Sequence, residues 1–142
     1  MAMNDSVRVQ REILDAMVAH ARREARTECC GLLAGRDGVI SEIFPATNAF
    51  SSPSVYEIAP KELFELFRKI RDAGLAHLGQ YHSHLFTENV PSPSDIEQAG
   101  YPDHVYFIVS PRADAPKRVR AFSIRDGLVR ELEIVSVIRQ PS

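Results

Sequence analysis

Two histidines separated by one residue, with an aspartate eleven positions after the second, constrain this chain more than any other feature. His82 and His84 stand at the end of a segment, starting at Ala76, that we predict to be a β-strand. Side chains alternate faces along a strand, so the two imidazoles are predicted to share a face and Ser83 to point away. The loop before Asp95 is long enough to bring its carboxylate beside them. Two imidazoles and one carboxylate match a catalytic zinc site whose fourth position is open to water.

The aspartate also belongs to a second pattern, which has a purely structural interpretation. Ser92-x-x-Asp95 fits a helix capping box, and Pro93 suits the first helical position. A lone His-x-His on a strand is more often a surface or packed-core feature than a metal site, so these residues alone leave metal binding open. The two interpretations are compatible, because a short helix at 94–99 capped by Ser92 would present Asp95 from its first turn.

Length, charge and cysteine content limit the classes of protein. The chain has 142 residues, and we expect 1–142 to form a single domain. A net charge of −2 gives no reason to expect nucleic acid or an anionic membrane surface as a partner, and no apolar run approaches the roughly 18 residues that span a bilayer. Met1 to Asp5 lack the pattern of a secretory signal. The two cysteines are adjacent, a poor arrangement for a structural disulfide, so we expect a cytoplasmic protein.

The hydrophobic pattern predicts an α/β fold, a mixed sheet with helices packed on it. Apolar residues recur at helical spacing in 11–25 and 60–73. Asp37-Gly38 and Asp126-Gly127 predict tight hairpin turns. Short apolar or β-prone runs predict strands at 7–10, 29–34, 39–44, 55–58, 76–84, 105–109, 119–124 and 128–135.

A zinc hydrolase also needs a proton acceptor that is not a ligand, to take a proton from the attacking water and pass it to the leaving amine. Glu88 lies in the loop between the proposed ligands and is the main rival to Glu28 on proximity. Glu28 opens a buried strand, where a carboxylate is often only a charge that meets solvent. Glu57 and Asp103 complete the candidates.

Taken together, Glu28, then His82-Ser83-His84, then seven residues and Ser92-x-x-Asp95, resemble the signature of the JAMM (MPN+) metalloprotease family. The segment from Glu28 to Gly35 is similar to that family's first motif. The order of predicted helices and strands between residues 7 and 135 fits the family's α/β fold. The resemblance therefore implies a JAB1/MPN-like, cytidine-deaminase-like fold, with a mixed β-sheet flanked by helices.

The resemblance implies a role for each residue of the motif. His82, His84 and Asp95 would bind one Zn²⁺ per chain, together with a catalytic water. Glu28 would act as general base and then as general acid. Ser92 would help to hold the oxyanion of the tetrahedral intermediate as a preorganised donor.

The resemblance also implies a class of substrate. The chain is short and resembles the stand-alone bacterial and archaeal branch of the family. Members of that branch cleave after the C-terminal Gly-Gly of small ubiquitin-like proteins, including sulfur carriers, and one of them releases cysteine from its carrier. We therefore expect hydrolysis of an amide or isopeptide bond after such a tail, with oligomeric state, a homodimer included, left open. Leu85 stands where many members have proline, so the path of the loop and the substrate preference stay open.

Two functions from other classes also stay open. A 2-His-1-carboxylate set suits non-haem iron enzymes, although the order of ligands and the Glu28 motif argue against one. A non-catalytic scaffold of the same fold assembles complexes. Such scaffolds typically lose metal ligands, whereas this chain keeps all of them.

The other side chains with reactive or ligating atoms have simpler interpretations. Cys29 and Cys30 are predicted to be small buried side chains rather than extra zinc ligands. Tyr56 and Phe86 either line a substrate groove or pack against the fold. Three further histidines are predicted to be structural: His20, His77 and His104.

Overall fold

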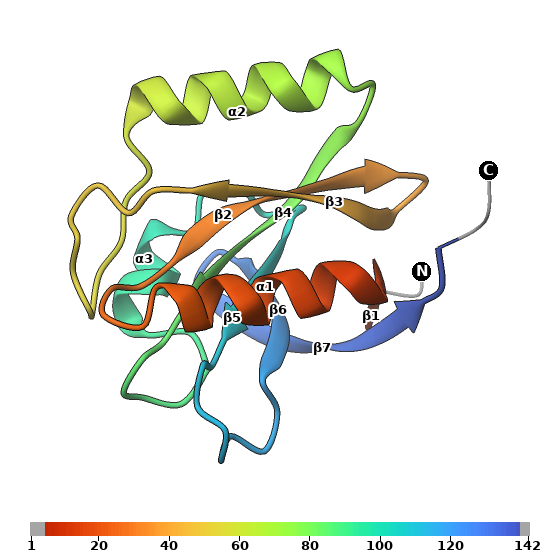
Figure 1. The fold of residues 1–142 in the computed structure, drawn as a ribbon. Helices are drawn as coiled ribbons and strands as arrows, with labels where there is room; N and C mark the ends of the chain where they lie inside the picture. Colours follow the sequence, from red (N-terminus) through yellow and green to blue (C-terminus); the bar gives the residue numbers. More distant parts are fainter. Residues whose placement is uncertain (1–4, 140–142) are drawn as a thin grey trace.

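A closed ring of paired strands forms the frame of the protein (Figure 1). The structure is a computed structural model that describes residues 5–139, so Met1 to Asn4, which entered the signal-peptide expectation, lie outside it. β7 pairs in parallel with β1, and this pairing closes the predicted mixed sheet into a barrel. Around the barrel the strands are β1 (Ser6–Gln10), β3 (Val39–Ala46), β2 (Cys30–Arg36), β4 (Ala76–Ser83), β5 (Val105–Val109), β6 (Val119–Arg125) and β7 (Leu128–Val137). The helices are α1 (Arg11–Arg23), α2 (Pro60–Asp72) and α3 (Pro93–Gln98).

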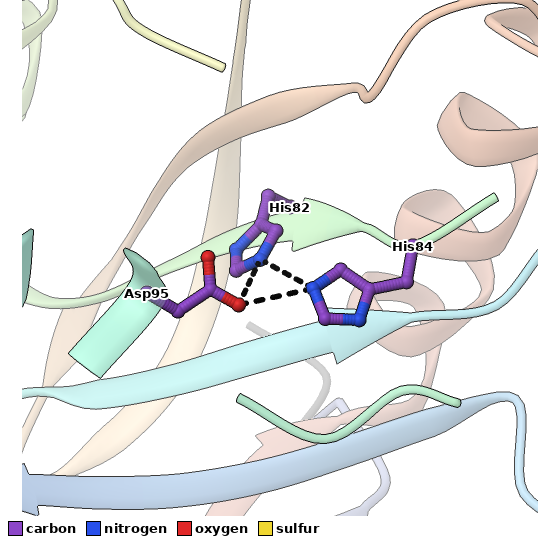
Figure 2. A group of neighbouring side chains, drawn as sticks. All are labelled: His82, His84 and Asp95. Carbon is purple, nitrogen blue, oxygen red and sulfur yellow. Dashed lines mark hydrogen bonds and ion pairs between the residues drawn. The ribbon is translucent and has the colours of Figure 1, made fainter. Parts of the chain in front are cut away.

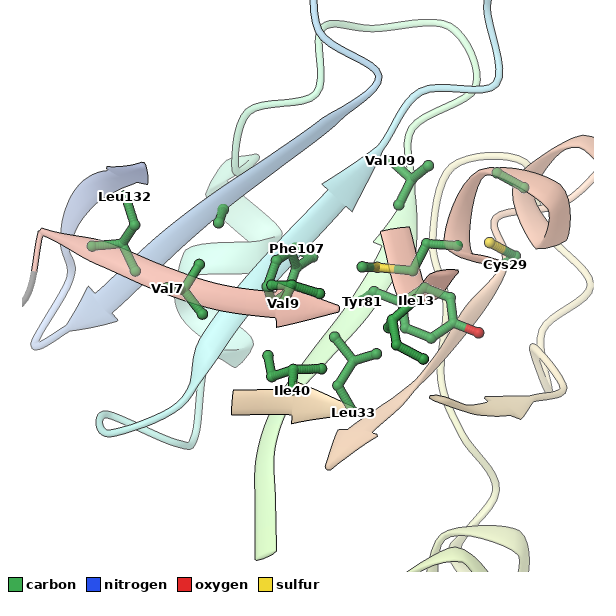
Figure 3. Close-up of a cluster of buried hydrophobic side chains, with 13 residues drawn as sticks. Val7, Val9, Ile13, Cys29, Leu33, Ile40, Tyr81, Phe107, Val109 and Leu132 are labelled. Carbon is green, nitrogen blue, oxygen red and sulfur yellow. The ribbon is translucent and has the colours of Figure 1, made fainter. Parts of the chain in front are cut away.

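The main core joins α1 to the strands around it (Figure 3). Ile13, Met17 and Ala21 recur at helical spacing, and they pack in one cluster with side chains from all seven of these strands. Tyr81 of β4 and Phe107 of β5 are the largest side chains in this cluster that are almost completely buried. Full burial of a side chain of this size stabilises a fold by roughly 1.5–3 kcal/mol. The cluster therefore fixes β4, the strand that carries the histidine motif.

Two smaller clusters cover the outer faces of the strands. Leu66 and Ile70 of α2 pack with Cys30 of β2, whereas Ile108 of β5 packs beside α3. In the strand register, Cys30 lies opposite His82 on one side of β4 and Ile108 lies opposite it on the other. His82 therefore lies on the outer face of the sheet, between the clusters that contain α2 and α3.

The predicted elements are confirmed with ends that move by at most two residues, with one exception. The strand predicted at 55–58 is wrong, because that segment pairs only through an isolated bridge between Ile58 and Asn48. Both predicted hairpin turns are confirmed: their paired Asp and Gly residues have φ angles between 50° and 79°, as two-residue hairpin turns require. No helix within residues 5–139 is long and apolar enough to cross a membrane.

Candidate metal centre

The end of β4 supplies two nitrogen donors that face each other. Alternation along the strand turns Ser83 inward, where its Oγ accepts a hydrogen bond from the Cys29 N–H at 2.9 Å. His84 lies just past β4, and its N–H donates to the Val109 carbonyl at 3.0 Å, which holds the backbone extended. The Nε2 atoms of His82 and His84 are 3.2 Å apart. Both side chains are almost fully buried, so the predicted shared face is confirmed.

The first turn of α3 brings a carboxylate to the same point (Figure 2). Ser92 caps the helix: its Oγ accepts from the Asp95 N–H at 3.1 Å, and its own N–H donates to Asp95 Oδ2 at 2.9 Å. The same Oδ2 lies 3.2 Å from His82 Nε2 and 3.0 Å from His84 Nε2. The predicted capping box is therefore confirmed, and the cap orients the carboxylate toward the two histidines.

The three donor atoms have the spacing that a metal ion needs. They all lie within 4.8 Å of one another. A tetrahedral zinc ion with bonds of ~2.0–2.1 Å separates its ligand atoms by about 3.3 Å, so the observed separations of 3.0–3.2 Å fit after a small outward movement. His84 Nδ1 donates to the Glu88 carbonyl at 2.8 Å, so a neutral His84 turns its Nε2 lone pair toward the Asp95 carboxylate. The Nε2 lone pair and the carboxylate oxygen are both hydrogen-bond acceptors, so a cation or a proton must lie between them.

Burial and the Asp95 carboxylate have opposite effects on the pKa values of His82 and His84. Burial is the dominant effect at His82 and lowers its pKa. Burial also acts to lower the pKa of His84, but the hydrogen bonds with Asp95 and the Glu88 carbonyl outweigh it and raise that pKa. Burial acts to raise the pKa of Asp95, yet the two histidines hold it well below its usual range. Asp95 is therefore ionised at neutral pH, as a metal-ligating carboxylate must be.

Glu28 lies beside the donors because of the pairing between β2 and β4. These strands are antiparallel with Cys30 opposite His82, so the same register, continued two residues beyond β2, sets Glu28 level with His84. The Glu28 side chain is buried, not directed into solvent. Burial raises its pKa to about 7; the nearby His84 opposes the shift and the Asp95 carboxylate adds to it. A carboxyl group that titrates near neutral pH can both accept and return a proton.

The other three candidates for the proton acceptor lie at the surface. Glu57, Glu88 and Asp103 all have exposed side chains. Asp103 forms an ion pair with Arg125 at 2.8 Å, and Glu88 contributes its backbone carbonyl, not its carboxylate, to His84. Of the four acidic candidates, the structure brings only Glu28 to the donors in buried form.

For Tyr56 the sequence left two roles open, lining a substrate groove or packing against the fold. Its ring stacks on the His82 imidazole, with centroids 4.6 Å apart and an angle of 22° between the planes. Phe86, by contrast, is 75% exposed and does not pack in the core. The segment that carries Tyr56 is held by hydrogen bonds from the Asn48 side chain to Val55 and Glu57. Sequence reasoning missed Asn48, because no local pattern marks this residue.

The remaining cysteines and histidines are not part of the donor group found within residues 5–139. Cys29 and Cys30 are buried as predicted, burial raises their pKa values to about 11 and about 12, and neither joins the donor group found in the described residues. His20 Nδ1 lies 2.7 Å from the buried Tyr81 hydroxyl. His77 and His104 contact each other and Tyr101 edge-on or stacked, as structural side chains do.

Comparison with known proteins gives matches over most of the chain. Residues 10–125 match the family described as "Prokaryotic homologs of the JAB domain". The CysO-cysteine peptidase of Mycobacterium tuberculosis is 39% identical over 134 residues, which cover 93% of this chain and 91% of that protein. The desampylase of Haloferax volcanii is 38% identical over 104 residues, which cover 68% of this chain and 75% of that protein.

Solved structures agree with the observed fold. A Desulfitobacterium hafniense protein, solved in solution, superposes with a TM-score of 0.83 at 31% identity and covers 94% of both chains. A JAB1/MPN domain protein from Archaeoglobus fulgidus superposes with a TM-score of 0.59 at 20% identity, covering 94% of this chain and 100% of that one. The JAB1/MPN-like α/β fold expected from the sequence is therefore confirmed.

Proposed function

This chain belongs to the family of prokaryotic homologs of the JAB domain, and on that premise we propose that it is a zinc-dependent metalloprotease. Its proposed reaction is hydrolysis of an amide or isopeptide bond after the C-terminal Gly-Gly of a ubiquitin-like or sulfur-carrier protein. One observation carries the proposal: the His82, His84 and Asp95 donor atoms converge at 3.0–3.2 Å, with the buried Glu28 beside them.

The relatives support a hydrolase that acts on conjugates. Their names describe a peptidase for CysO-cysteine, a desampylase and, in Thermus thermophilus, a probable protease that cleaves TtuB-protein conjugates. One of these substrates is an amino-acid conjugate and another is a protein conjugate. The proposal for this chain therefore covers both kinds of leaving amine.

The proposed chemistry gives each residue of the site a separate task. His82, His84 and Asp95 would hold the zinc ion, which supplies Lewis acidity and makes a water nucleophilic at neutral pH. Glu28 takes a proton at its carboxylate and returns it to the leaving amine. The Ser92 Oγ uses a lone pair to accept from the Asp95 N–H, so its hydroxyl hydrogen is free to donate to the oxyanion.

The preference for glycine follows from the position of the donors. His82 lies in β4, which pairs with β2 on one side and β5 on the other. The Tyr56 ring stacks on His82, and the first turn of α3 brings Asp95 beside it. A peptide tail that places its last carbonyl beside the donors must pass close to backbone on both sides. Glycine permits this approach because it has no Cβ.

The test uses conjugates that differ only in their last two carrier residues. We expect the zinc-loaded protein to release cysteine, or a linked protein, from a ubiquitin-like carrier that ends in Gly-Gly, and to be much slower on the Ala-Ala conjugate. A chelator should stop the reaction and added Zn²⁺ should restore it. Equal rates on both conjugates would remove the glycine preference, and no hydrolysis of either would refute the proposed activity.

Two measurements separate this proposal from its rivals. Metal analysis of protein purified without added metal distinguishes zinc from the iron of a 2-His-1-carboxylate oxygenase. A scaffold of the same fold would bind a carrier without cleaving it. The presence of all three donors together with a buried carboxyl group of raised pKa favours the hydrolase.

A further inference from the structure

The segment between β3 and α2 is tied to the backbone of Glu28 from two sides. The Glu28 N–H donates to the Ser52 carbonyl at 2.8 Å. The Glu28 carbonyl accepts from Asn48 Nδ2 at 3.0 Å. Both main-chain groups of the proposed base are therefore held by this segment, although it lies some twenty residues further along the chain.

The Asn48 side chain is the centre of this arrangement. Besides Glu28, its Nδ2 donates to the Val55 carbonyl at 2.9 Å and, less closely, to the Ser52 carbonyl at 3.3 Å. Its Oδ1 accepts from the N–H groups of Phe50 at 3.0 Å and Glu57 at 3.2 Å. Asn48 is only 7% exposed, and both hydrogens and both lone pairs of its amide are used. A buried amide with every partner in place can accept only one arrangement of the segment.

The same amide fixes the position of Tyr56. Val55 and Glu57 are the residues on either side of Tyr56, and Asn48 bonds one through its Nδ2 and the other through its Oδ1. The Tyr56 ring is thereby held against the His82 imidazole, 4.6 Å away between centroids. The stack fixes the plane of that imidazole and hence the direction in which its Nε2 points.

We infer that Asn48 is a positioning residue that couples the proposed base to a proposed metal ligand: one amide holds the backbone of Glu28 and, through Tyr56, the ring plane of His82. The inference rests on the proposed function and adds to it a residue that touches neither metal nor substrate. Removal of a group that orients a metal ligand without binding the metal itself typically lowers metal affinity or activity ~10–100-fold.

The chain offers a matched set of variants. Asn48→Asp keeps the shape and the Oδ1 acceptor but removes the donors to Glu28 and Val55. Tyr56→Leu removes the stacked ring, whereas Tyr56→Phe keeps it. Ser52→Ala is the control in the same segment, because it removes the Oγ that accepts from the Ser54 and Val55 N–H groups and leaves the Ser52 carbonyl and the Asn48 amide in place.

One measurement tests the effect of Asn48 on Glu28, and a second tests its effect on His82. Steady-state kinetics should show kcat lowered ~10–100-fold by Asn48→Asp with little change in KM, since the base is displaced while the tail still binds. The rate of zinc release to a chelator, which needs no substrate, should rise ~10-fold or more for Tyr56→Leu and for Asn48→Asp. Tyr56→Phe should restore slow release, and Ser52→Ala should match the wild type in both measurements.

The double variant Asn48→Asp/Tyr56→Leu decides whether the residues act together. If Asn48 acts on His82 through Tyr56, the double variant should release zinc no faster than the faster single variant. Multiplied effects on zinc release, or an Asn48→Asp variant that lowers only the melting temperature, would overturn the inference. Should Asn48→Asp not fold, Tyr56→Leu with unchanged zinc release is sufficient to refute it. A wild type that binds no zinc and cleaves nothing refutes the proposed function itself, which distinguishes the two failures.

Discussion

Replacement of Glu28 by glutamine tests the proposed site most directly, because it keeps the shape of the side chain and removes its proton acceptor. General-base assistance is worth typically 10²–10⁴-fold, so kcat of the zinc-loaded variant should fall by that factor. Zinc stoichiometry should stay at one per chain, because Glu28 is not among the three donors. The matched control is Glu88→Gln, which alters an exposed carboxylate and leaves the backbone carbonyl that accepts from His84.

The same variant has a predicted effect on stability in the metal-free protein. Burial raises the pKa of Glu28 from 4.5 to about 7, so between these pH values the folded state binds more protons than the unfolded state. The free energy of unfolding of the wild type therefore falls as pH rises through this window. Each unit of pKa difference between the folded and unfolded states corresponds to about 1.4 kcal/mol of free energy. Above pH 7 the ionised Glu28 side chain therefore lowers the free energy of unfolding by roughly 3 kcal/mol.

Glutamine at position 28 does not ionise, so it avoids this cost. The metal-free Glu28→Gln protein should be more stable than wild type by roughly 3 kcal/mol at pH 8, and the two should converge near pH 4. Urea unfolding of chelator-treated protein at both pH values measures the difference. Equal stability at pH 8, or activity within threefold of wild type, would refute the reasoning. If Glu88→Gln instead caused the large loss of kcat, the base assignment would move to Glu88.

The remaining predictions concern the donors, the cap and the core. Alanine at any one of His82, His84 or Asp95 should abolish zinc binding, measured by metal analysis after dialysis; full occupancy in all three variants would exclude the site. Ser92→Ala should lower thermal stability by about 1 kcal/mol through loss of the helix cap, and kcat ~10²–10³-fold if the hydroxyl holds the oxyanion; a loss of stability alone would restrict Ser92 to the cap. Tyr81→Phe should lower the free energy of unfolding in urea by about 1–3 kcal/mol, because buried His20 Nδ1 loses the Tyr81 hydroxyl that lies 2.7 Å away; an unchanged free energy would show that water replaces that hydroxyl.

Features fixed by a few neighbouring residues could be predicted from the sequence. The turns at Asp37-Gly38 and Asp126-Gly127 need positive φ at both positions, and these residue pairs adopt it at little cost. The cap of α3 is formed by Ser92 and Asp95 alone, so their spacing predicts it. The shared face of His82 and His84 follows from alternation along one strand. In each case the interacting groups lie within a few residues of one another.

The tertiary structure decided what depends on partners far apart in the chain. The pairing of Cys30 with His82 puts Glu28 level with His84, whereas the residues alone left four acidic candidates open, with Glu88 as the main rival on proximity. The segment predicted as a strand at 55–58 has the right residues for one, but the Asn48 amide binds its backbone groups instead, and Tyr56 reaches His82 as a result. Closure of the barrel likewise pairs β1 with β7, two strands more than a hundred residues apart in the sequence. A local pattern carries no information on such contacts, because their free energy is gained only when distant segments pack and remove each other from water.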